Sequence, residues 1–195
     1  MKFNGTMKFL SLSLLGLVWN FNLQAQTYQL NKNATSVLVE GTSNIHDWHI
    51  EAESCSGTIT LETDEGKIDD IEKLQFSVEA ESLKSGKSGM DKNTYKALNT
   101  GDHKNIVFRM EKVNSMKETA AGTYLVKASG KLEIAGMKRD TELQFTLKTA
   151  SDRVELQGSK DIDMTAYQIE PPSAMFGTIT TGKMVTVKFK TIFRK

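Results

Sequence analysis

Hydrophobic and polar residues alternate along most of the chain, from about residue 35 to the C-terminus. In the stretch 74–80, Leu74, Phe76, Val78 and Ala80 occupy every second position, with polar residues between them. Similar alternation recurs in four further stretches, at residues 106–110, 124–134, 143–148 and 185–190. Because neighbouring side chains of a strand point to opposite faces, this pattern is typical of strands with one dry face and one wet face.

Short sequences rich in polar residues and glycine separate these stretches. The sequences "DEGK" at 64–67, "AAGT" at 120–123, "AGMK" at 135–138 and "TTGK" at 180–183 fit tight connections between antiparallel strands. Strands do not alternate with long helical patterns, which argues against a parallel sheet. The sequence predicts strands near residues 35–42, 45–53, 55–63, 72–82, 104–114, 122–135, 138–149, 152–163 and 183–193.

One segment, residues 88–101, departs from the strand pattern. Met90, Thr94, Tyr95 and Leu98 recur there at helical spacing, with an aspartate near the start of the segment and a glycine at its end. These are the boundaries that helices prefer. We therefore predict one short helix inside a long crossover between strands.

Many long antiparallel strands in one domain must hide their edges. Closing the sheet into a barrel removes the edges completely, whereas a two-sheet sandwich protects them only in part. A barrel of about eight strands can also enclose an interior of the size of a ligand. We therefore expect an all-β fold, an extended antiparallel β-barrel of about eight strands with one short helix in a crossover, and the sandwich is the competing arrangement.

The first 25 residues follow the three-part plan of a secretory signal peptide. Lys2 and Lys8 precede the apolar run "FLSLSLLGLVW" at 9–19, and small and polar residues follow it. The run is shorter than the roughly 20 apolar residues that span a bilayer, so a retained anchor is the less favoured alternative. We expect a signal peptide at 1–25, a domain at 26–195, and a periplasmic or secreted protein without stable membrane insertion after cleavage.

Charge and cysteine content narrow the function classes further. The chain has 25 basic and 24 acidic residues, and this balance argues against nucleic acid, which needs a concentrated basic face. Cys55 is the only cysteine, so no intramolecular disulfide can form and the core must hold the domain together.

The stretch "NIHDWHIEA" at 44–52 raises the question of a metal or catalytic site. Strand parity places His46 with Trp48 on one face and His49 on the opposite face, so the two imidazoles cannot share an ion without a bulge. A zinc site would also need further ligands, and His103 is the only other histidine. We predict no metal, cofactor or catalytic residue, and keep a metal-dependent enzyme using the His46–Asp47 region as an alternative.

The predicted inward faces of the strands are almost entirely apolar. Such a surface cannot orient a polar substrate, but it suits an apolar chain, since each buried methylene contributes about 0.8 kcal/mol. Parity alone leaves open whether these side chains fill the barrel or line a cavity. The candidate ligand-binding residues on the strands are Trp48, Ile50, Phe76, Val78, Phe108, Met110, Ile134, Phe145, Leu147, Val187 and Phe189.

A second group of apolar residues lies outside the strands. Tyr95 and Leu98 belong to the predicted helix, and Met175 and Phe176 follow the proline pair 171–172, which cannot lie inside a central strand. Methionine and phenylalanine adapt to variable apolar shapes. We predict that these four residues gate the mouth of a hydrophobic tunnel as a lid, with ordinary loop packing as the alternative.

Three blocks of the sequence resemble the YceI-like family of secreted bacterial proteins. They are "MDKNTYKALNTGDHKNIVFRMEKV", "GKLEIAGMKRDTELQFTL" and "MTAYQIEPPSAMFGTITTGKMVTVKFK", in the order and spacing of that family. The early "GTSNIHDWHIEAE" is similar to the first hairpin of the branch common in Bacteroidetes-type bacteria. One departure is Lys104-Asn105 in "DHKNIVF", where the family often has a proline before the strand.

The resemblance implies a lipocalin-like barrel with a helix across it, holding an isoprenoid or other lipid chain. The expected function is therefore a periplasmic or secreted carrier that binds an isoprenoid-like or other lipid chain non-covalently. The alternative is a filled barrel that acts through its outer face as an adhesion or partner-binding module. A homodimer is left open.

Overall fold

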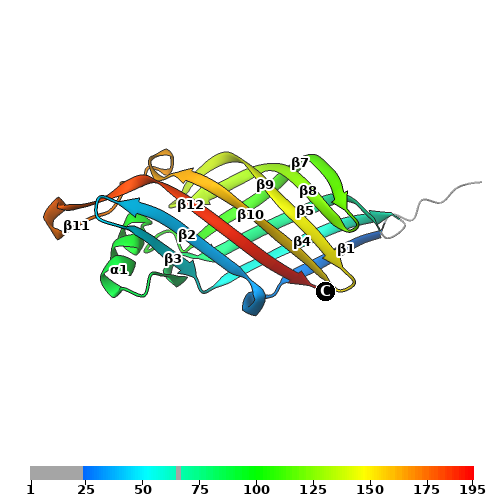
Figure 1. The fold of residues 1–195 in the computed structure, drawn as a ribbon, viewed down its shortest axis with the longest axis horizontal. Coiled ribbons are helices and arrows are strands. Elements are labelled where there is room, and N and C mark those ends of the chain that lie inside the picture. Colours follow the sequence, from blue (N-terminus) through cyan, green and yellow to red (C-terminus); the bar gives the residue numbers. More distant parts are fainter. Residues whose placement is uncertain (1–23, 65–66) are drawn as a thin grey trace, which may run out of the picture.

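The computed structural model describes residues 24–64 and 67–195 of the 195-residue chain. The predicted signal peptide lies almost wholly outside the described residues. The described chain is one antiparallel sheet, wrapped around itself, with one α-helix at one end (Figure 1). The all-β prediction is confirmed, as is the single helix of the crossover, α1 (Ser88–Ala97).

The strands follow one another mostly as hairpins. Their bounds are β1 (Gln24–Leu30), β2 (Ser36–Ser43), β3 (Asp47–Ala52), β4 (Cys55–Asp64), β5 (Lys67–Glu79), β6 (Leu83–Lys84), β7 (Asn105–Ala120), β8 (Thr123–Ile134), β9 (Met137–Ala150), β10 (Arg153–Asp163), β11 (Ser173–Ala174) and β12 (Ile179–Arg194). Short 3-10 helices include η1 (Lys32–Ala34), η2 (Ala80–Ser82), η3 (Met164–Tyr167) and η4 (Met175–Gly177).

The sheet closes because its first strand, β1, pairs with its last strand, β12. The strand order β1-β4-β5-β7-β8-β9-β10-β12 returns to its start because β12 also pairs with β1, at Gln29 with Arg194 and Leu30 with Phe193. Farther along, β12 pairs instead with β2, to which β3 and β6 are added. The ring is therefore narrow and closed at the β1 end, and it widens into an extra wall at the other.

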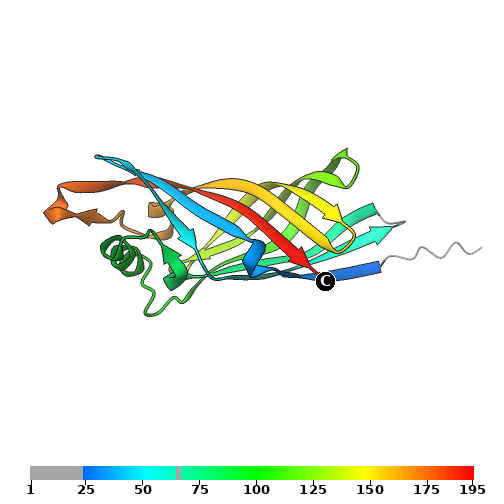
Figure 2. The same ribbon diagram turned by 60° about the horizontal axis from the view of Figure 1, so that its bottom comes forward.

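The helix and β11 lie together at this wider end, opposite the start of β1 and the β7–β8 turn (Figures 1 and 2). The crossover that carries α1 leaves the sheet after β6 and returns at β7. Its return is well hydrogen bonded without a proline: the Ala80 amide donates to the Lys104 carbonyl at 2.8 Å. The departure at Lys104-Asn105 therefore leaves the start of β7 well anchored.

Two strands differ from their predicted bounds because of β-bulges. The strand β5 begins at Lys67 rather than near 72, since Ile68, Ile71 and Leu74 are all buried although they are three residues apart. Register shifts against β4 insert one extra residue twice, which keeps all three side chains on the inner face. In β7, repeated shifts extend the strand to Ala120 in the same way.

The closed half of the barrel is a packed core. The large side chains with almost no exposed area are Phe193, Ile59, Leu61, Ile71, Leu147, Val126 and Val154. Tyr28 of β1 joins them, and its hydroxyl donates to Gln26 Oε1 at 2.9 Å. Cys55 is also buried, and burial raises the pKa of its thiol to about 11, so it behaves as an unreactive small hydrophobic residue.

Candidate ligand-binding cavity

The wider half of the barrel is hollow. A cavity of about 760 Å³ lies there, bounded by the inner faces of the sheet and by α1 and β11. This volume falls within the range of about 300–1,000 Å³ that is typical of small-molecule sites. The barrel therefore combines the two possibilities that strand parity left open, because one half is filled and the other is a cavity.

The register of four strands orders one cavity wall into rows. The deepest of three full rows contains Gly158, Phe189 and Val37, on β10, β12 and β2 respectively, and the lining residues Leu156 and Thr191 lie beyond it toward the packed half. The middle row runs from Lys160 through Val187 and Val39 to Ile50. The row nearest the opening runs from Ile162 through Val185 and Gly41 to Trp48.

Most of the residues predicted from strand parity line this cavity. Phe145 and Phe108 are buried, whereas Val187 and Phe189 remain half-exposed because the cavity in front of them is accessible. The predicted residues that lie in the lining are Trp48, Ile50, Phe76, Val78, Leu98, Phe108, Ile134, Phe145, Val187 and Phe189.

Five predicted residues lie elsewhere. Leu147 points inward but belongs to the packed half, and Met110 lies on the inner face of β7 without reaching the cavity. Tyr95 is turned away from the cavity by its hydrogen bonds, described below. Met175 and Phe176 lie at an exposed tip rather than over the opening, with 69% and 110% of their area accessible. Parity finds inward-facing residues but does not show how deep each one lies.

Tyr95 fastens α1 to the sheet. Its hydroxyl lies 2.9 Å from the Glu81 carbonyl oxygen and 3.0 Å from the Leu83 carbonyl oxygen, and it shares its one proton between them. It also accepts a hydrogen bond of 2.6 Å from Lys84 Nζ, and this bond raises the pKa of Lys84. The face of α1 that borders the cavity is therefore formed by other residues of the helix.

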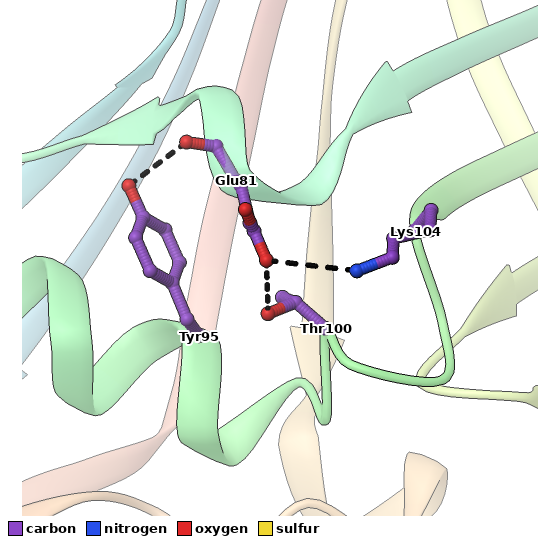
Figure 3. Close-up of polar contacts among 4 residues, drawn as sticks. All are labelled: Glu81, Tyr95, Thr100 and Lys104. Atoms are coloured by element: carbon purple, nitrogen blue, oxygen red, sulfur yellow. Dashed lines mark hydrogen bonds and ion pairs between the residues drawn. The ribbon is translucent and has the colours of Figure 1, made fainter.

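A second contact holds the end of the helix. Thr100 Oγ1 donates to Glu81 Oε1 at 2.9 Å, and Lys104 Nζ lies 3.9 Å from the same oxygen (Figure 3). The start of the helix is fixed by Asp91, whose Oδ1 accepts from the amide and hydroxyl of Ser85 at 2.8 and 2.6 Å. These bonds lower the pKa of Asp91. The helix thus forms a fixed side of the opening.

Replacing Tyr95 by phenylalanine is expected to loosen α1 without unfolding the barrel. The change removes the hydroxyl proton shared between the carbonyls of η2 and β6, a contact worth about 1 kcal/mol. Amide hydrogen exchange measured by mass spectrometry should therefore accelerate in residues 88–97 and stay unchanged in β8 and β9. Tyr28→Phe, which removes a hydroxyl in the packed half, is the control. Unchanged exchange across the helix would show that the hydroxyl does not anchor it.

Several lining residues were missed by the sequence reasoning. Leu74, Leu156 and Phe193 separate the cavity from the packed half, and Val39 lies in the middle row. Lys160 was missed as well, although it has the same parity as Val154 and Leu156 on β10. Continuing that alternation past glycine at 158 would have placed this lysine on the inner face.

The two histidines of the β2–β3 hairpin, His46 and His49, lie on opposite sides of the sheet, as parity predicts. His46 lines the cavity near its opening, and its Nδ1 lies 2.9 Å from the Asp47 carbonyl oxygen. His49 is exposed on the outer side of β3, where it borders a separate shallow depression. Within residues 24–64 and 67–195, no group of three or more histidine, cysteine, aspartate or glutamate side chains is arranged to hold a metal ion.

Trp48 owes its position to a glycine on the neighbouring strand. A Cβ atom at Gly41 would lie 2.2 Å from Trp48 Cζ2, so the indole covers the Gly41 backbone where a larger residue would displace it. The indole Nε1 donates to the Thr42 carbonyl at 3.1 Å. The ring is therefore fixed at the opening, with its apolar surface available to the cavity.

Comparison with known proteins agrees with this architecture. The model of the YceI-like domain family matches residues 28–193. A polyisoprenoid-binding domain from Saccharophagus degradans, implicated in plant cell wall breakdown, is similar in structure, with a TM-score of 0.67 and 15% identity over 86% of this chain and 97% of that one. Burkholderia cenocepacia BcnA gives a TM-score of 0.65 and 13% identity, over 84% of this chain and 98% of that one.

A YceI protein of Campylobacter jejuni is more distant, with a TM-score of 0.52 and 10% identity over all of this chain and 93% of that one. No curated protein matches the chain significantly. Among the described residues, no helix has the length and hydrophobicity to cross a membrane. The family match covers most of the sequence, and with the closed antiparallel sheet it shows that this chain belongs to the YceI-like family.

Proposed function

We propose that this protein binds an isoprenoid-like or other lipid chain non-covalently in the cavity and acts as its carrier. The observation that carries the proposal is a cavity of about 760 Å³ whose walls are formed mainly by apolar side chains of β2, β3, β10, β12 and neighbouring strands. A chain that buries ten methylenes there would gain on the order of 8 kcal/mol before the costs of association. The polyisoprenoid-binding domain of S. degradans supports the same class of ligand.

The N-terminal sequence supports a periplasmic or secreted carrier. The cationic start, the short apolar run and the polar residues after it are those of a cleaved signal peptide. The strand β1 begins at Gln24, so a cleavage after residue 25 would remove only its first two residues, which pair with Thr63 and Glu62. Pairing from Gln26 onward would remain.

The two alternative functions have less support. A filled barrel that acts only through its outer face does not account for the hollow half. An enzyme centred on His46 and Asp47 would need converging groups, yet His46 Nδ1 is engaged with the Asp47 main chain and His49 is on the other face. We therefore favour binding over catalysis.

A fluorescence titration tests the proposal. Trp48 lines the cavity and the only other tryptophan is Trp19, so the full chain with Trp19→Phe has a single tryptophan that reports on the site. Farnesol, added to protein stripped of bound lipid by organic extraction and refolding, should shift and saturate the Trp48 emission. Emission that stays constant while farnesol also fails to co-elute with the protein would contradict lipid binding.

A further inference from the structure

Lys160 is the one inward-pointing charge of the strand wall described above. It shares the inner face of β10 with Leu156, Gly158 and Ile162, and its register partner on β12 is Val187. The side chain is half-buried and lines the cavity. Within the part of the chain that the structure describes, Lys160 Nζ forms no ion pair.

The neighbouring carboxylates of β10 face the other way. Asp161 accepts a hydrogen bond of 2.6 Å from Thr186 Oγ1, and Asp163 lies 3.1 Å from Lys183 Nζ, both on the outer side of the sheet. No aspartate or glutamate among the described residues belongs to the cavity lining, whereas Lys87, directly before α1, and Lys92 on α1 do. Apart from the histidine at its opening, the ionisable side chains that border the cavity are therefore all lysines.

Placing a lysine in an apolar row is costly unless an anion accompanies it. Its flexible four-carbon stem can bury itself along the wall while the ammonium group reaches toward the opening. An anionic group held there would form charge-assisted hydrogen bonds, which are stronger than neutral ones. The apolar chain attached to that group would then extend toward Phe145, Leu156 and Phe193 at the boundary of the packed half.

We propose that Lys160 is a head-group site and that the ligand is an amphiphile with an anionic end, such as a phosphate or a carboxylate, rather than a neutral lipid. This inference rests on the proposed lipid-binding function and specifies the ligand class. Lys87 and Lys92 also line the cavity and add positive charge to it. The neutral chain and the anionic end are thus recognised by different parts of one cavity.

Farnesyl phosphate and farnesol test the head-group site, because they share one chain and differ only at its end. Titration in the Trp19→Phe chain should show at least tenfold tighter binding of the phosphate. Lys160→Met keeps the length of the stem and should remove this preference, while Lys160→Arg should keep it. Lys127→Met, on the outer face of β8, is the matched control and should bind both compounds as the parent does.

The outcomes separate the two levels of the proposal. Equal affinity for farnesol and farnesyl phosphate, or a preference that survives in Lys160→Met, overturns the head-group site and leaves the lipid carrier intact. If neither compound binds the parent protein, the carrier function itself fails. Farnesoic acid, whose chain ends in a carboxylate, is tested beside the phosphate and distinguishes a general anion site from one shaped for phosphate.

An independent observation concerns the tip formed by Met175 and Phe176 of η4, with Ile45 exposed on the adjoining β2–β3 turn. All three side chains are exposed, to 69%, 110% and 58%. Met175 and Phe176 have φ angles of 51° and 54°, in the left-handed region that non-glycine residues rarely adopt. Such a conformation persists only where the surrounding structure imposes it.

Hydrogen bonds hold this tip in place. Asn44 Nδ2 donates to the Thr178 carbonyl at 2.9 Å, and Asn44 Oδ1 accepts from the Thr180 amide at 3.0 Å. The β2–β3 turn that carries Ile45 is thereby joined to the β11–β12 hairpin that carries Phe176. The tip projects from the same end of the barrel as α1 (Figure 2).

We infer that this tip inserts into the interfacial region of a lipid bilayer while ligand enters or leaves. A fixed, fully exposed phenylalanine beside a cavity opening is suited to the boundary between head groups and acyl chains, where apolar side chains are buried. Lys87 and Lys92, which line the same cavity, are complementary to anionic head groups. The tip therefore contacts a membrane surface and does not cover the cavity of its own barrel.

Vesicle binding and transfer test the docking tip. The full chain should co-sediment with phosphatidylcholine vesicles that contain phosphatidylglycerol, and Met175→Ser/Phe176→Ser should lose most of this binding. The double variant should also transfer farnesyl phosphate between vesicles at least fivefold more slowly, with unchanged affinity in solution. Leu125→Ser, an exposed apolar residue on β8, is the control. Unchanged sedimentation, or a dimer of the parent chain that the double variant dissociates, would overturn membrane docking.

Discussion

Replacing Val187 by tryptophan is expected to remove most lipid binding while the barrel stays folded. Val187 lies in the middle row of the cavity wall, between Lys160 and Val39, and faces open space. An indole there would occupy volume that the ligand needs. Losing contact with about three methylenes costs about 2.4 kcal/mol, which corresponds to roughly a fiftyfold weaker Kd.

Isothermal titration with farnesol measures this effect directly. Val107→Trp, which adds the same side chain to the outer face of β7, is the control and should bind as the parent does. Circular dichroism should show the same strand content in all three proteins. Parent-like affinity in a folded Val187→Trp variant would mean that the ligand does not occupy the hollow half.

Replacing Leu147 by alanine is expected to lower the stability of the barrel while leaving lipid binding almost unchanged. Leu147 is completely buried in the packed half, opposite Tyr124 on β8 and Leu156 on β10. Truncation leaves a hole in a close-packed region, and such changes typically cost about 2–5 kcal/mol of stability. Because the residue does not line the cavity, the affinity for farnesol should change less than twofold.

Urea unfolding followed by circular dichroism gives the free energy of unfolding for this variant. Leu125→Ala, on the neighbouring strand but partly exposed, should lower it by less than about 1 kcal/mol. A Leu147→Ala protein that is as stable as the parent would contradict the division into a packed and a hollow half. So would a Leu147→Ala protein that is fully folded but binds farnesol much more weakly.

The barrel could be predicted because most of its strands have one dry and one wet face. In β8, every second residue from Tyr124 to Ile134 is buried, so alternation and structure agree. The start of β5 was missed because its bulges place Ile68, Ile71 and Leu74 on one face at intervals of three. Alternation cannot show a strand whose register shifts with its partner.

The candidate site was predicted in part for a related reason. Parity placed Trp48, Phe145 and Phe189 on the inner face, where all three line the cavity, since the inward side chains of a regular strand share one parity. It could not separate them from Leu147, because depth along the barrel depends on how far the strands are staggered. Nor could it foresee that the polar end of Tyr95 would bond to η2 and β6, a contact between distant segments.

The signal peptide and the cellular location are predictions from the N-terminal sequence. Sequencing the N-terminus of the protein recovered from its native host would check them. The expected result is a mature chain that begins near residue 26. A chain that still carries the apolar run would favour a retained anchor.

The central claim is that the hollow half of the barrel holds a lipid chain. The most direct measurement is native mass spectrometry of the protein purified without detergent, followed by organic extraction and mass analysis of what is released. The proposal predicts one bound apolar chain per protein, carrying an anionic end, and its absence from the Val187→Trp variant. Recovery of ligand-free protein that also fails to take up farnesol or farnesyl phosphate would contradict the claim.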